Sequence, residues 1–586
     1  MEEALVNESA PSEAIVNQTE EPNSTPYLNS FLNTEYGIIG RTASTRSEPN
    51  TSSKFHFWIA NREEARLKLE IGNIIAVISD DNDEVTFGIV IEMRSYSDID
   101  SFLADYLSHN FGEADTQVPT DISEVVVVTC DVMRNISGTT KPVGRSRAFF
   151  PTEQGIRFAY GIVDERGNYI FSGAAIPVGI FENGDGTVAP ISIDEDYLTG
   201  PDGAHLNISG ISGLAAKTSA LEFVLKSLLT HTGKRIAVVM FNVKSKDLLY
   251  VEQSNPRAIE DHWSVRAYEA LEVPIEPFNE AQFFAPADPQ NPSGTQSRRQ
   301  LPTNRFHWDL QMIYQDIPSL FSQLDWDDKM EGVWFVIREE IRIGNILTYA
   351  DMLQWTNRLI DDANRRNNQY PRGNHIATWN KMRMHLRRFP RSFHGLISSV
   401  GSGQDISWDN LSNGSVFIID IEMLSDRGKR LVFGRSIRAI GNILESEDAE
   451  IDNAVVFVDE LNKFAPSGMV RTPLKSRLID ITARGRSIGL VLFGAEQFAS
   501  DVEKEVFENS STFLFGRTES TELRTPTYSV LSNEVKTKLS MLPQGQLLVK
   551  FPKFPQPIFV KFPYPPCLPG DQFDLDSYRA VQGSSS

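Results

Sequence analysis

The first part of the chain carries short apolar runs that are separated by polar turns. Between residue 54 and about residue 177, these runs lie at positions 74–78, 87–91, 125–129 and 157–162. Short apolar runs that are bounded by turn-forming residues, such as those at 80–83, are typical of β-strands. The pattern therefore predicts a small N-terminal β-barrel over residues 54–180.

After this region, apolar runs alternate with stretches of helical periodicity. The runs lie at positions 236–241, 416–420, 455–458, 490–493 and 512–515. They are apolar at almost every position, as expected of parallel strands that are covered on both faces. Helical patterns such as 427–445 lie between them, which is typical of a doubly wound α/β sheet. We predict an α/β core in two parts, residues 181–304 and 401–550.

Three segments depart from this alternation. Residues 305–400 show helical periodicity and predict a helical insertion within the core. Residues 284–304, just before it, are rich in Pro, Asn, Gln and Ser, which favours a loop. The Pro-rich segment 551–569 fits neither a central strand nor a regular helix. We therefore predict that residues 551–586 form an extended strap and tail, with room to cross a neighbouring subunit.

Composition and charge narrow the class of protein. With 40% hydrophobic and 23% charged residues, the chain has the balance of a globular protein. Residues 1–53, rich in Ser, Asn, Thr and Glu, instead predict a disordered arm. The net charge of −22 argues against nucleic-acid binding by the whole outer surface, but not against binding in a basic channel. Two cysteines supply neither a disulfide framework nor a zinc site, and neither a signal peptide nor a membrane-spanning run is visible, so we expect a cytoplasmic protein.

A glycine-containing turn leads into the helix predicted at 217–229. It spans residues 207–219 and holds Gly210, Gly213, Lys217 and Thr218. Backbone N–H groups at a helix start, together with a lysine ammonium, suit a polyphosphate anion. The turn departs from the usual phosphate-loop pattern, because Ala216 replaces the last glycine and Ile211 stands at the first glycine position. A small-residue turn that only caps the helix remains the alternative interpretation.

A second motif lies far downstream, at residues 453–460. There an apolar run ends in Asp459 and Glu460. At the carboxyl end of a parallel strand, the first acid can hold the Mg²⁺ that bridges two phosphates, and the second can polarise the attacking water. The two motifs occur in the order, and at the separation, that a nucleotide-binding α/β domain requires. Together they predict a nucleotide site more strongly than either does alone.

These features resemble the HerA family of ring-forming ATPases, in the HerA/FtsK group. The resemblance covers about residues 54–570 and is most specific in the segments VDELNKFAP, RGRSIGL and GAEQ, which follow one another from residue 458 to residue 497. The loop GISGLAAKT is similar to that of the branch in bacterial antiviral defence, whose members are encoded beside a nuclease or a sirtuin-type NADase. The resemblance implies an α/β, RecA-like P-loop ATPase core with an N-terminal HAS-type barrel and a helical insertion. It also implies a homohexamer, with ATP and Mg²⁺ as cofactors.

The resemblance further implies a role for each residue at a matching position. Lys217 would hold the β and γ phosphates, Thr218 and Asp459 the Mg²⁺, Glu460 would act as catalytic base and Gln497 would sense the γ-phosphate. The remaining residues implied for the nucleotide loop are Gly210, Ser212, Gly213, Ala215, Ala216 and Ser219. Arg486, with Arg484 close by, matches the family's charge-neutralising arginine. Arg517 is a further candidate that can act across a subunit boundary.

The segment 355–391 has a local excess of basic residues in an acidic chain. It holds Arg358, Arg365, Arg366, Arg372, Lys381, Arg383, Arg387, Arg388 and Arg391, against Asp361 and Asp362. Such an excess can follow a nucleic-acid backbone without reading the bases. It is equally typical of a solvated helix face or of a contact with an acidic neighbouring subunit.

Two functions remain open from the sequence. In the first, which the resemblance favours, a hexamer hydrolyses ATP between subunits and translocates or remodels double-stranded DNA. An effector, either a nuclease or a sirtuin-type NADase from a neighbouring gene, would dock at the barrel and act in antiphage defence. In the second, the ring binds ATP with little turnover and serves as a scaffold that clusters a toxic effector. A metabolic P-loop kinase is disfavoured by the length of the chain and by the barrel.

Overall fold

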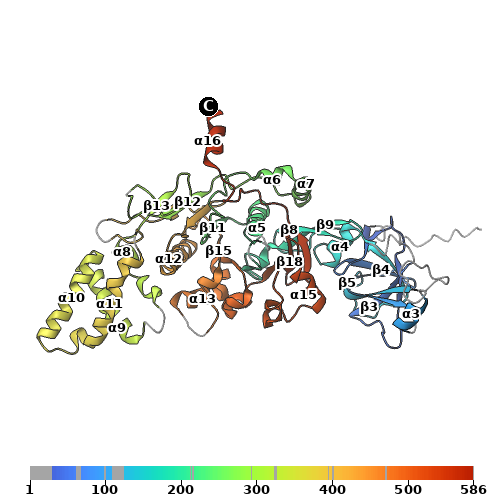
Figure 1. Cartoon of the computed structure of the whole chain (residues 1–586), viewed down its shortest axis with the longest axis horizontal. Helices are drawn as coiled ribbons and strands as arrows, with labels where there is room; N and C mark the ends of the chain where they lie inside the picture. Colours follow the sequence, from blue (N-terminus) through green and yellow to red (C-terminus); the bar gives the residue numbers. More distant parts are fainter. Residues whose placement is uncertain are drawn as a thin grey trace, which may run out of the picture.

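The computed structural model describes most of the chain. Described are residues 30–60, 68–97, 101–108, 124–211, 213, 217–291, 293–321, 326–393, 395–398, 402–468 and 472–584. A barrel and a helical bundle lie at opposite ends of a central α/β body (Figure 1). No helix among these described residues is long and apolar enough to cross a membrane.

A closed β-barrel forms the N-terminal domain. Its strands are β2 (Gly40–Ala43), β3 (Lys54–Ile59), β4 (Ile74–Ser79), β5 (Val85–Ser97), β6 (Glu124–Asn135) and β7 (Ser146–Pro151). They pair in the order β7-β2-β3-β6-β5-β4, and a further β7–β4 pairing closes the barrel. Buried side chains that include Phe55, Phe57 and Phe150 fill it, because alternate residues of each strand point inward. The predicted barrel is thus present.

The barrel begins earlier in the chain than the sequence predicted. The described part of the predicted disordered arm, residues 30–53, contains β2 and β1 (Leu32–Asn33), and β1 pairs with β7. Phe31 and Ile39 are buried there. The prediction of an arm is therefore wrong for residues 30–53, whose few apolar residues are enough to join an existing sheet. Residues 1–29 lie outside the described residues.

Residues 157–159 of the predicted strand at 157–162 are instead the end of a helix. Helix α4 (Glu153–Ala159) begins at Thr152, whose side chain accepts a hydrogen bond from the Gly155 N–H at 3.1 Å. The residues that follow this cap bury Ile156 and Phe158 on the side of the barrel. A short apolar run does not distinguish a strand from a buried helix, and the threonine cap before it was the informative signal.

The central body is built on one large sheet. Its strand order is β13-β12-β14-β11-β15-β16-β10-β17-β18-β19-β8-β9. The parallel strands are β10 (Leu206–Ser209), β11 (Ile236–Asn242), β12 (Gln282–Pro286), β13 (Asn304–Phe306), β14 (Val416–Asp420), β15 (Asn453–Asp459), β16 (Leu490–Glu496) and β17 (Thr512–Phe515). In this sheet β16 lies between the strand that leads into the glycine turn, β10, and the strand that ends in the acidic pair, β15. This is the RecA-like α/β architecture that the sequence predicted.

The other strands of the sheet are antiparallel and correct two of the predictions. They are β8 (Ala175–Glu182), β9 (Val188–Asp194), β18 (Gln546–Lys550) and β19 (Ile558–Lys561). Strand β19 lies inside the predicted strap and pairs on both sides, which was not expected. Its prolines flank residues 558–561 and occupy none of those ladder positions, so the strand keeps its N–H donors. Strand β8 belongs to this sheet although the barrel was predicted to reach residue 180. A third correction comes from the parallel strands β12 and β13, which occupy the ends of the predicted loop 284–304.

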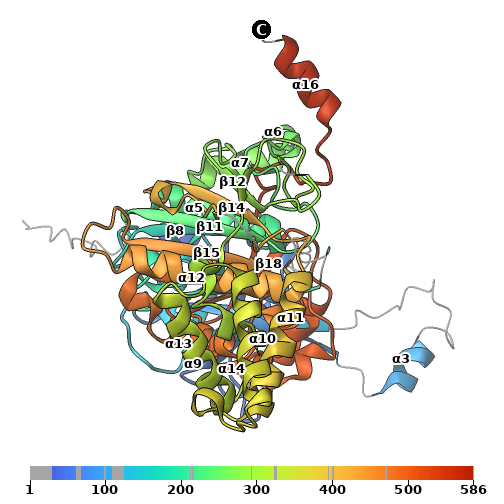
Figure 2. The same ribbon diagram turned by 90° about the vertical axis from the view of Figure 1, so that its left-hand side faces the viewer.

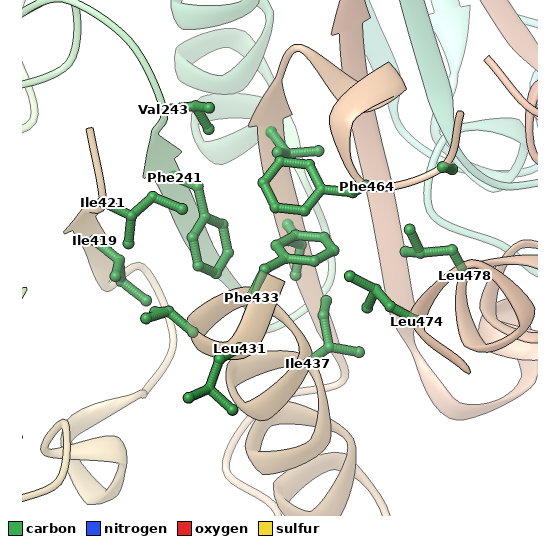
Figure 3. Close-up of a cluster of buried hydrophobic side chains, with 14 of the residues drawn as sticks. Phe241, Val243, Ile419, Ile421, Leu431, Phe433, Ile437, Phe464, Leu474 and Leu478 are labelled. Carbon is green, nitrogen blue, oxygen red and sulfur yellow. The ribbon is translucent and has the colours of Figure 1, made fainter. Parts of the chain in front are cut away.

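Alternate side chains of each central strand enter two separate cores. In β11, Ala237, Val239 and Phe241 pack on one face, and Ile236, Val238 and Met240 on the other. The first face is covered by α12 (Asp426–Leu444) and α13 (Pro473–Ile488), and the second by α5 (Lys217–His231) and α7 (His262–Leu271). Figure 3 shows Phe241, Phe433 and Phe464 meeting in the first core. This double burial explains why the strands are apolar throughout.

The predicted insertion is a helical bundle, which projects from the body in Figure 1 and lies in front of it in Figure 2. Its helices are α9 (Asp328–Arg342), α10 (Tyr349–Arg365) and α11 (Ile376–Ser392), and Trp334, Met352 and Trp379 are buried between them. The remaining helices are α3 (Phe102–Ser108), α6 (Pro256–Glu260), α8 (Leu310–Ile313), α14 (Lys504–Glu508), α15 (Asn533–Ser540) and α16 (Leu575–Ser584). Helix α16 points away from the body in both views.

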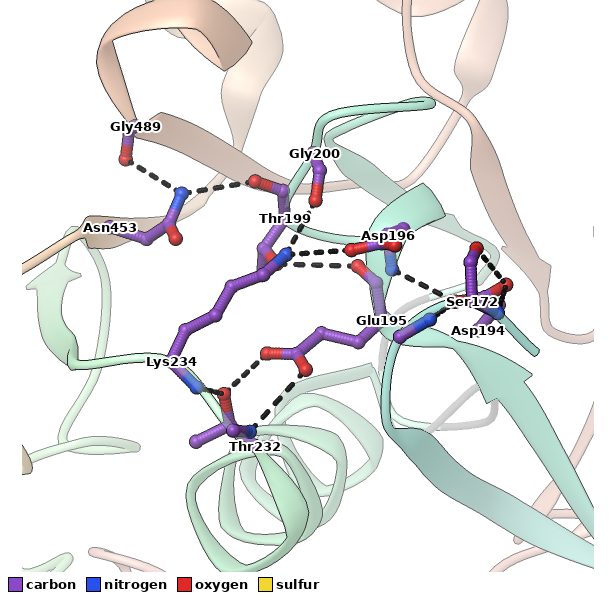
Figure 4. A network of polar contacts seen from close by, with 12 residues as sticks. Ser172, Asp194, Glu195, Asp196, Thr199, Gly200, Thr232, Lys234, Asn453 and Gly489 are labelled. Carbon is purple, nitrogen blue, oxygen red and sulfur yellow. Dashed lines mark hydrogen bonds and ion pairs between the residues drawn. The ribbon is translucent and has the colours of Figure 1, made fainter. Parts of the chain in front are cut away.

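A polar network holds the segment that enters β10 against the amino ends of its neighbours (Figure 4). Lys234 Nζ donates to Asp196 Oδ1 at 3.0 Å and to Thr199 Oγ1 at 3.1 Å. The Asn453 side-chain amide, at the start of β15, donates to the Thr199 carbonyl at 3.0 Å. These bonds place the strand before the glycine turn in a fixed register with the strand that ends in the acidic pair.

We expect Phe433→Ala to destabilise the α/β body by about 3–5 kcal/mol, because it leaves a cavity between two rings. The Phe433 ring centroid lies 5.0 Å from that of Phe241 and 4.5 Å from that of Phe464. Urea unfolding monitored by circular dichroism measures the change. Phe102→Ala is the control, since Phe102 is 96% exposed, and it should change stability by less than about 0.5 kcal/mol. Equal effects of the two changes would contradict this account of the core.

Candidate functional site

The carboxyl ends of the central strands enclose a pocket of about 250 Å³. Its lining includes Gly213, Lys217, Thr218, Ser219, Glu222, Lys244, Asp247, Asp459, Gln544 and Pro569. Gly213 follows β10, Lys244 and Asp247 follow β11, and Asp459 is the last residue of β15. The other lining residues come from helix α5, from the turn before β18 and from the segment after β19. The glycine turn and the acidic strand, although more than two hundred residues apart in the sequence, therefore meet in one site.

The glycine turn is held by its neighbours on both sides. Gly210 has a φ of 148° and Gly213 a φ of 79°, values in the left-handed region that favours glycine. The Ile211 N–H donates to the Arg517 carbonyl at 2.9 Å, and Gln544 Nε2 donates to the Gly213 carbonyl at 3.2 Å. Of the residues predicted to bind nucleotide, Ser212, Ala215 and Ala216 lie outside the described residues.

Lys217 begins helix α5 and points into the turn. Its side chain is nearly buried, with a residue exposure of 6%, and Nζ donates to the Gly210 carbonyl at 2.7 Å. Burial lowers the pKa of this ammonium, and the charge of Asp459 opposes the shift. Thr218 and Ser219 follow on the first turn of the helix and are half-buried. The lysine is thus placed where it can exchange a carbonyl for a phosphate oxygen.

Asp459 is the last residue of β15 and Glu460 follows it, and both lie beside a lysine that the sequence did not single out. Lys244 Nζ lies 3.6 Å from Asp459 Oδ2 and 3.7 Å from Glu460 Oε1, and Lys463 also pairs with Glu460. Burial raises the pKa of Asp459. Burial acts in the same direction on Glu460, but Lys463 and Lys244 outweigh it, so its pKa is lowered and the carboxylate is ionised at neutral pH. The position of Lys244, just after an apolar run, was a signal that could have found it.

The structure draws attention to Glu496 where the sequence pointed to Gln497. Glu496 ends β16 and is buried beneath the glycine turn, whereas Gln497 is exposed. Asn207 Nδ2 donates to Glu496 Oε2 at 3.2 Å, and within the described residues Glu496 Oε1 and Asn207 Oδ1 have no hydrogen-bond partner. Burial raises the pKa of Glu496 well above its usual value. Glu222, a pocket residue on α5, is also buried, and burial together with the nearby Asp247 raises its pKa.

The predicted arginines fall into two groups. Arg517 follows β17 at the same edge of the sheet as the pocket, and its carbonyl holds the glycine turn. Arg484 and Arg486 are exposed near the end of α13, before β16 begins. Because β16 runs from there to the pocket edge, its length separates them from the site of their own chain by about 20 Å. Within one chain, the structure does not bring Arg484 and Arg486 to Lys217.

Comparison with known proteins gives structural similarity at low sequence identity. No protein-family model and no curated protein matches the chain. VirB4 of Thermoanaerobacter pseudethanolicus is 16% identical, with a TM-score of 0.42 over 67% of this chain and 97% of that one. The bacterial conjugative coupling protein TrwB is 14% identical, with a TM-score of 0.41 over 63% and 87%. The genome packaging NTPase B204 of Sulfolobus turreted icosahedral virus 2 is 19% identical, with a TM-score of 0.22 over 28% and 78%. At this level of similarity, the function has to be argued from the pocket.

We expect Glu496→Gln to remove a pH dependence of stability. The raised pKa keeps the folded carboxyl protonated where the unfolded chain, near the usual value of 4.5, has lost its proton. The stability of the natural chain therefore falls as pH rises above that value, and glutamine cannot ionise. The melting temperature of the variant should exceed that of the natural protein by a margin that grows as the pH rises above 4.5. Glu519→Gln, at an exposed position, is the control, and a margin that does not change with pH would refute the assignment.

Proposed function

We propose that the chain is a P-loop ATPase that binds Mg²⁺·ATP in the pocket between Lys217 and Asp459. One observation carries the proposal: a buried lysine at a helix start and the acidic end of a parallel strand line the same cavity of about 250 Å³. Helix start, lysine and acid supply the charges and donors that a magnesium polyphosphate needs. A turn that only caps helix α5 would not require Asp459 or Lys244 beside it.

The side chains of the pocket suit a magnesium–ATP complex. The Lys217 ammonium would move from the Gly210 carbonyl, 2.7 Å away, to the β and γ phosphates. The Thr218 hydroxyl and the Asp459 carboxylate would hold Mg²⁺, with phosphate oxygens and water as its other ligands. In the described residues no cluster of three His, Cys, Asp or Glu side chains is placed to hold a metal. A cation beside Asp459 would favour the charged form of a carboxyl group whose pKa burial has raised.

Glu460 is suited to orienting the attacking water. Its φ of 57° turns the chain sharply after Asp459, and such strained positions cluster at functional sites. Its ion pairs with Lys244 and Lys463 keep it ionised. The bound Mg²⁺ would neutralise charge on the transferred phosphoryl group. Gln497, which follows the same edge, remains the proposed γ-phosphate sensor.

The position of the arginines leads us to propose action between subunits. Arg484 and Arg486 are exposed at the opposite edge of the sheet from their own pocket, so they could reach a nucleotide only in another chain. Head-to-tail contacts that close into a ring would place them there. We therefore propose a homohexamer in which these arginines complete the neighbouring site, with Arg517 as an alternative from the same edge as the pocket.

We propose double-stranded DNA as the partner moved or remodelled by the ring, without base specificity. The bundle supports this, because Arg358, Arg366 and Arg387 are exposed on α10, just after it and on α11, and exposed arginines displace counterions from a duplex. Two other arginines form ion pairs within the bundle, Arg365 with Asp362 at 2.6 Å and Arg372 with Glu340 at 3.4 Å. The side chain of Arg391 lies outside the described residues.

An effector, either a nuclease or a sirtuin-type NADase, is proposed to dock at the barrel in a cytoplasmic antiphage system. The apolar side chains of α3 support a protein contact there, because Phe102, Leu103 and Tyr106 are 96%, 65% and 52% exposed. The free cysteines Cys130 and Cys567 agree with a reducing compartment.

The second candidate function is a scaffold that binds ATP with little turnover. It is favoured by Ala216, which adds a Cβ just before Lys217 in the turn.

We expect Lys217→Ala to weaken ATP binding by about tenfold or more, through loss of a charged contact. Glu460→Gln should bind ATP normally and lower turnover by about 10²-fold or more. Isothermal titration and a phosphate-release assay, with and without duplex DNA, measure the two effects. Lys226→Ala, on the same helix and 4.0 Å from Glu276, should change neither. Equal and negligible turnover in the natural protein and Glu460→Gln would favour the scaffold.

Mixing two inactive variants tests whether Arg486 acts between chains. Lys217→Ala and Arg486→Ala should each be inactive alone. In an equal mixture, about one interface in four of a head-to-tail ring joins an intact pocket to an intact arginine, so about a quarter of the natural ATPase rate should return. No recovery, in subunits shown to exchange, would place the arginine's role within its own chain.

A further inference from the structure

A second pocket, of about 240 Å³, adjoins the proposed phosphate site. Ser219 and Gln544 line both pockets. Aromatic and prolyl residues form one part of its wall, namely Trp263, Phe562, Pro563, Tyr564 and Pro565. Asp261 and Lys561 supply charge in its lining. Ser219, Ser264 and Gln544 add further polar side chains. Aromatic walls together with convergent polar groups are typical of a site for a small organic ligand.

The walls of this pocket are fixed by hydrogen bonds between distant segments. Asp261 caps helix α7 by accepting from the Ser264 N–H at 2.8 Å, which orders the turn that carries Trp263. The Tyr564 N–H donates to Ser264 Oγ at 3.2 Å, and the Tyr268 hydroxyl donates to the Tyr564 carbonyl at 2.7 Å. The segment after β19 is thus tied to α7 along the length of the pocket. A cavity built in this way is preorganised for its ligand.

The order of groups along a nucleotide matches the order of the two pockets. Lys217 and Asp459 lie in the first pocket, where they would hold the β and γ phosphates. Ser219 lies two residues further along the first turn of α5, where N–H groups face the α phosphate in a phosphate loop. The group that follows the α phosphate must continue past Ser219, and the second pocket opens there. Gln544, which holds the Gly213 carbonyl at 3.2 Å, lines the passage.

We propose that this second pocket binds the nucleoside of ATP, with the base packed against Trp263. The proposal rests on the proposed function, because it takes the phosphates to lie beside Lys217. Lys561 Nζ lies 3.8 Å from the centre of the Trp263 ring, so a cation already occupies a π-face of this side chain. A base would share this ring system with Lys561, as stacking of bases on aromatic side chains needs only a π-face. Trp263 is a binding residue here and has no part in the chemistry.

Comparing ATP with inorganic tripolyphosphate separates the nucleoside contact from the phosphate contact. In isothermal titrations with Mg²⁺, the natural protein should bind ATP more tightly than tripolyphosphate. Trp263→Leu, which keeps apolar bulk but loses the aromatic face, should weaken ATP binding by about tenfold and leave tripolyphosphate binding unchanged. Trp263→Phe should retain most of the ATP affinity. Trp58→Ala, at a surface position on the barrel, is the control, and thermal melts establish that each variant is folded.

The possible outcomes distinguish failure of the nucleoside pocket from failure of the proposed ATP site. If the natural protein binds neither ligand, the proposed ATP site and the nucleoside pocket both fail. If Lys217→Ala abolishes binding of both ligands while Trp263→Leu affects neither, the phosphate site stands and the nucleoside pocket is refuted. An equal loss of ATP and tripolyphosphate binding in a folded Trp263→Leu protein would also refute it, because the tryptophan would then act on the loop and not on the base.

Discussion

The charges at the carboxyl edge of the parallel strands are the constraint on which the site depends. Asp459, Glu460 and Glu496 come together there, with Lys217 and Lys244 beside them. Burying a charged carboxylate is unfavourable unless the group is paired with a cation or is protonated. Both arrangements occur at this edge of the sheet. Lys244 and Lys463 pair with Glu460, whereas burial raises the pKa of Glu496 and favours its neutral form. Asp459 combines the two cases, because it lies near Lys244 and burial still raises its pKa. A divalent cation beside it would favour ionisation of its carboxyl group.

The C-terminal segment ties this edge to the rest of the molecule. Strand β19 pairs with β18 and β8, and thereby joins the antiparallel end of the sheet. The residues that follow it form a wall of the second pocket, and Pro569 reaches the first. The Asn255 side-chain amide donates to the Pro565 carbonyl at 2.9 Å, which holds the segment against the body of its own chain. Residues of this segment therefore line both pockets while they are packed against the body of their own chain.

Sequence patterns predicted the elements with strong and repeated signals. The five long apolar runs are all parallel strands, since double burial demands apolar side chains on both faces. The barrel and the helical insertion were predicted for similar reasons. The predictions that were wrong concerned segments whose local composition does not distinguish a strand from a helix or a loop. Residues 157–159 belong to a helix because Thr152 caps it, and β19 forms within a Pro-rich segment because its prolines lie outside the ladder positions.

By itself, the sequence determined which groups could bind a magnesium polyphosphate, because Gly210, Lys217, Thr218, Asp459 and Glu460 stand in recognisable local patterns. It also determined that the strands carrying them are buried. Only the tertiary structure decided which further residues join the site. Lys244 and Glu222 belong to no motif, and they reach the pocket through strand order and helix packing. Glu496 is buried behind the pocket, where its backbone carbonyl accepts a hydrogen bond from the Gly210 N–H. The same strand geometry puts Arg484 and Arg486 at the far edge, because side-chain proximity depends on which ends of the strands lie together, and local sequence does not encode that.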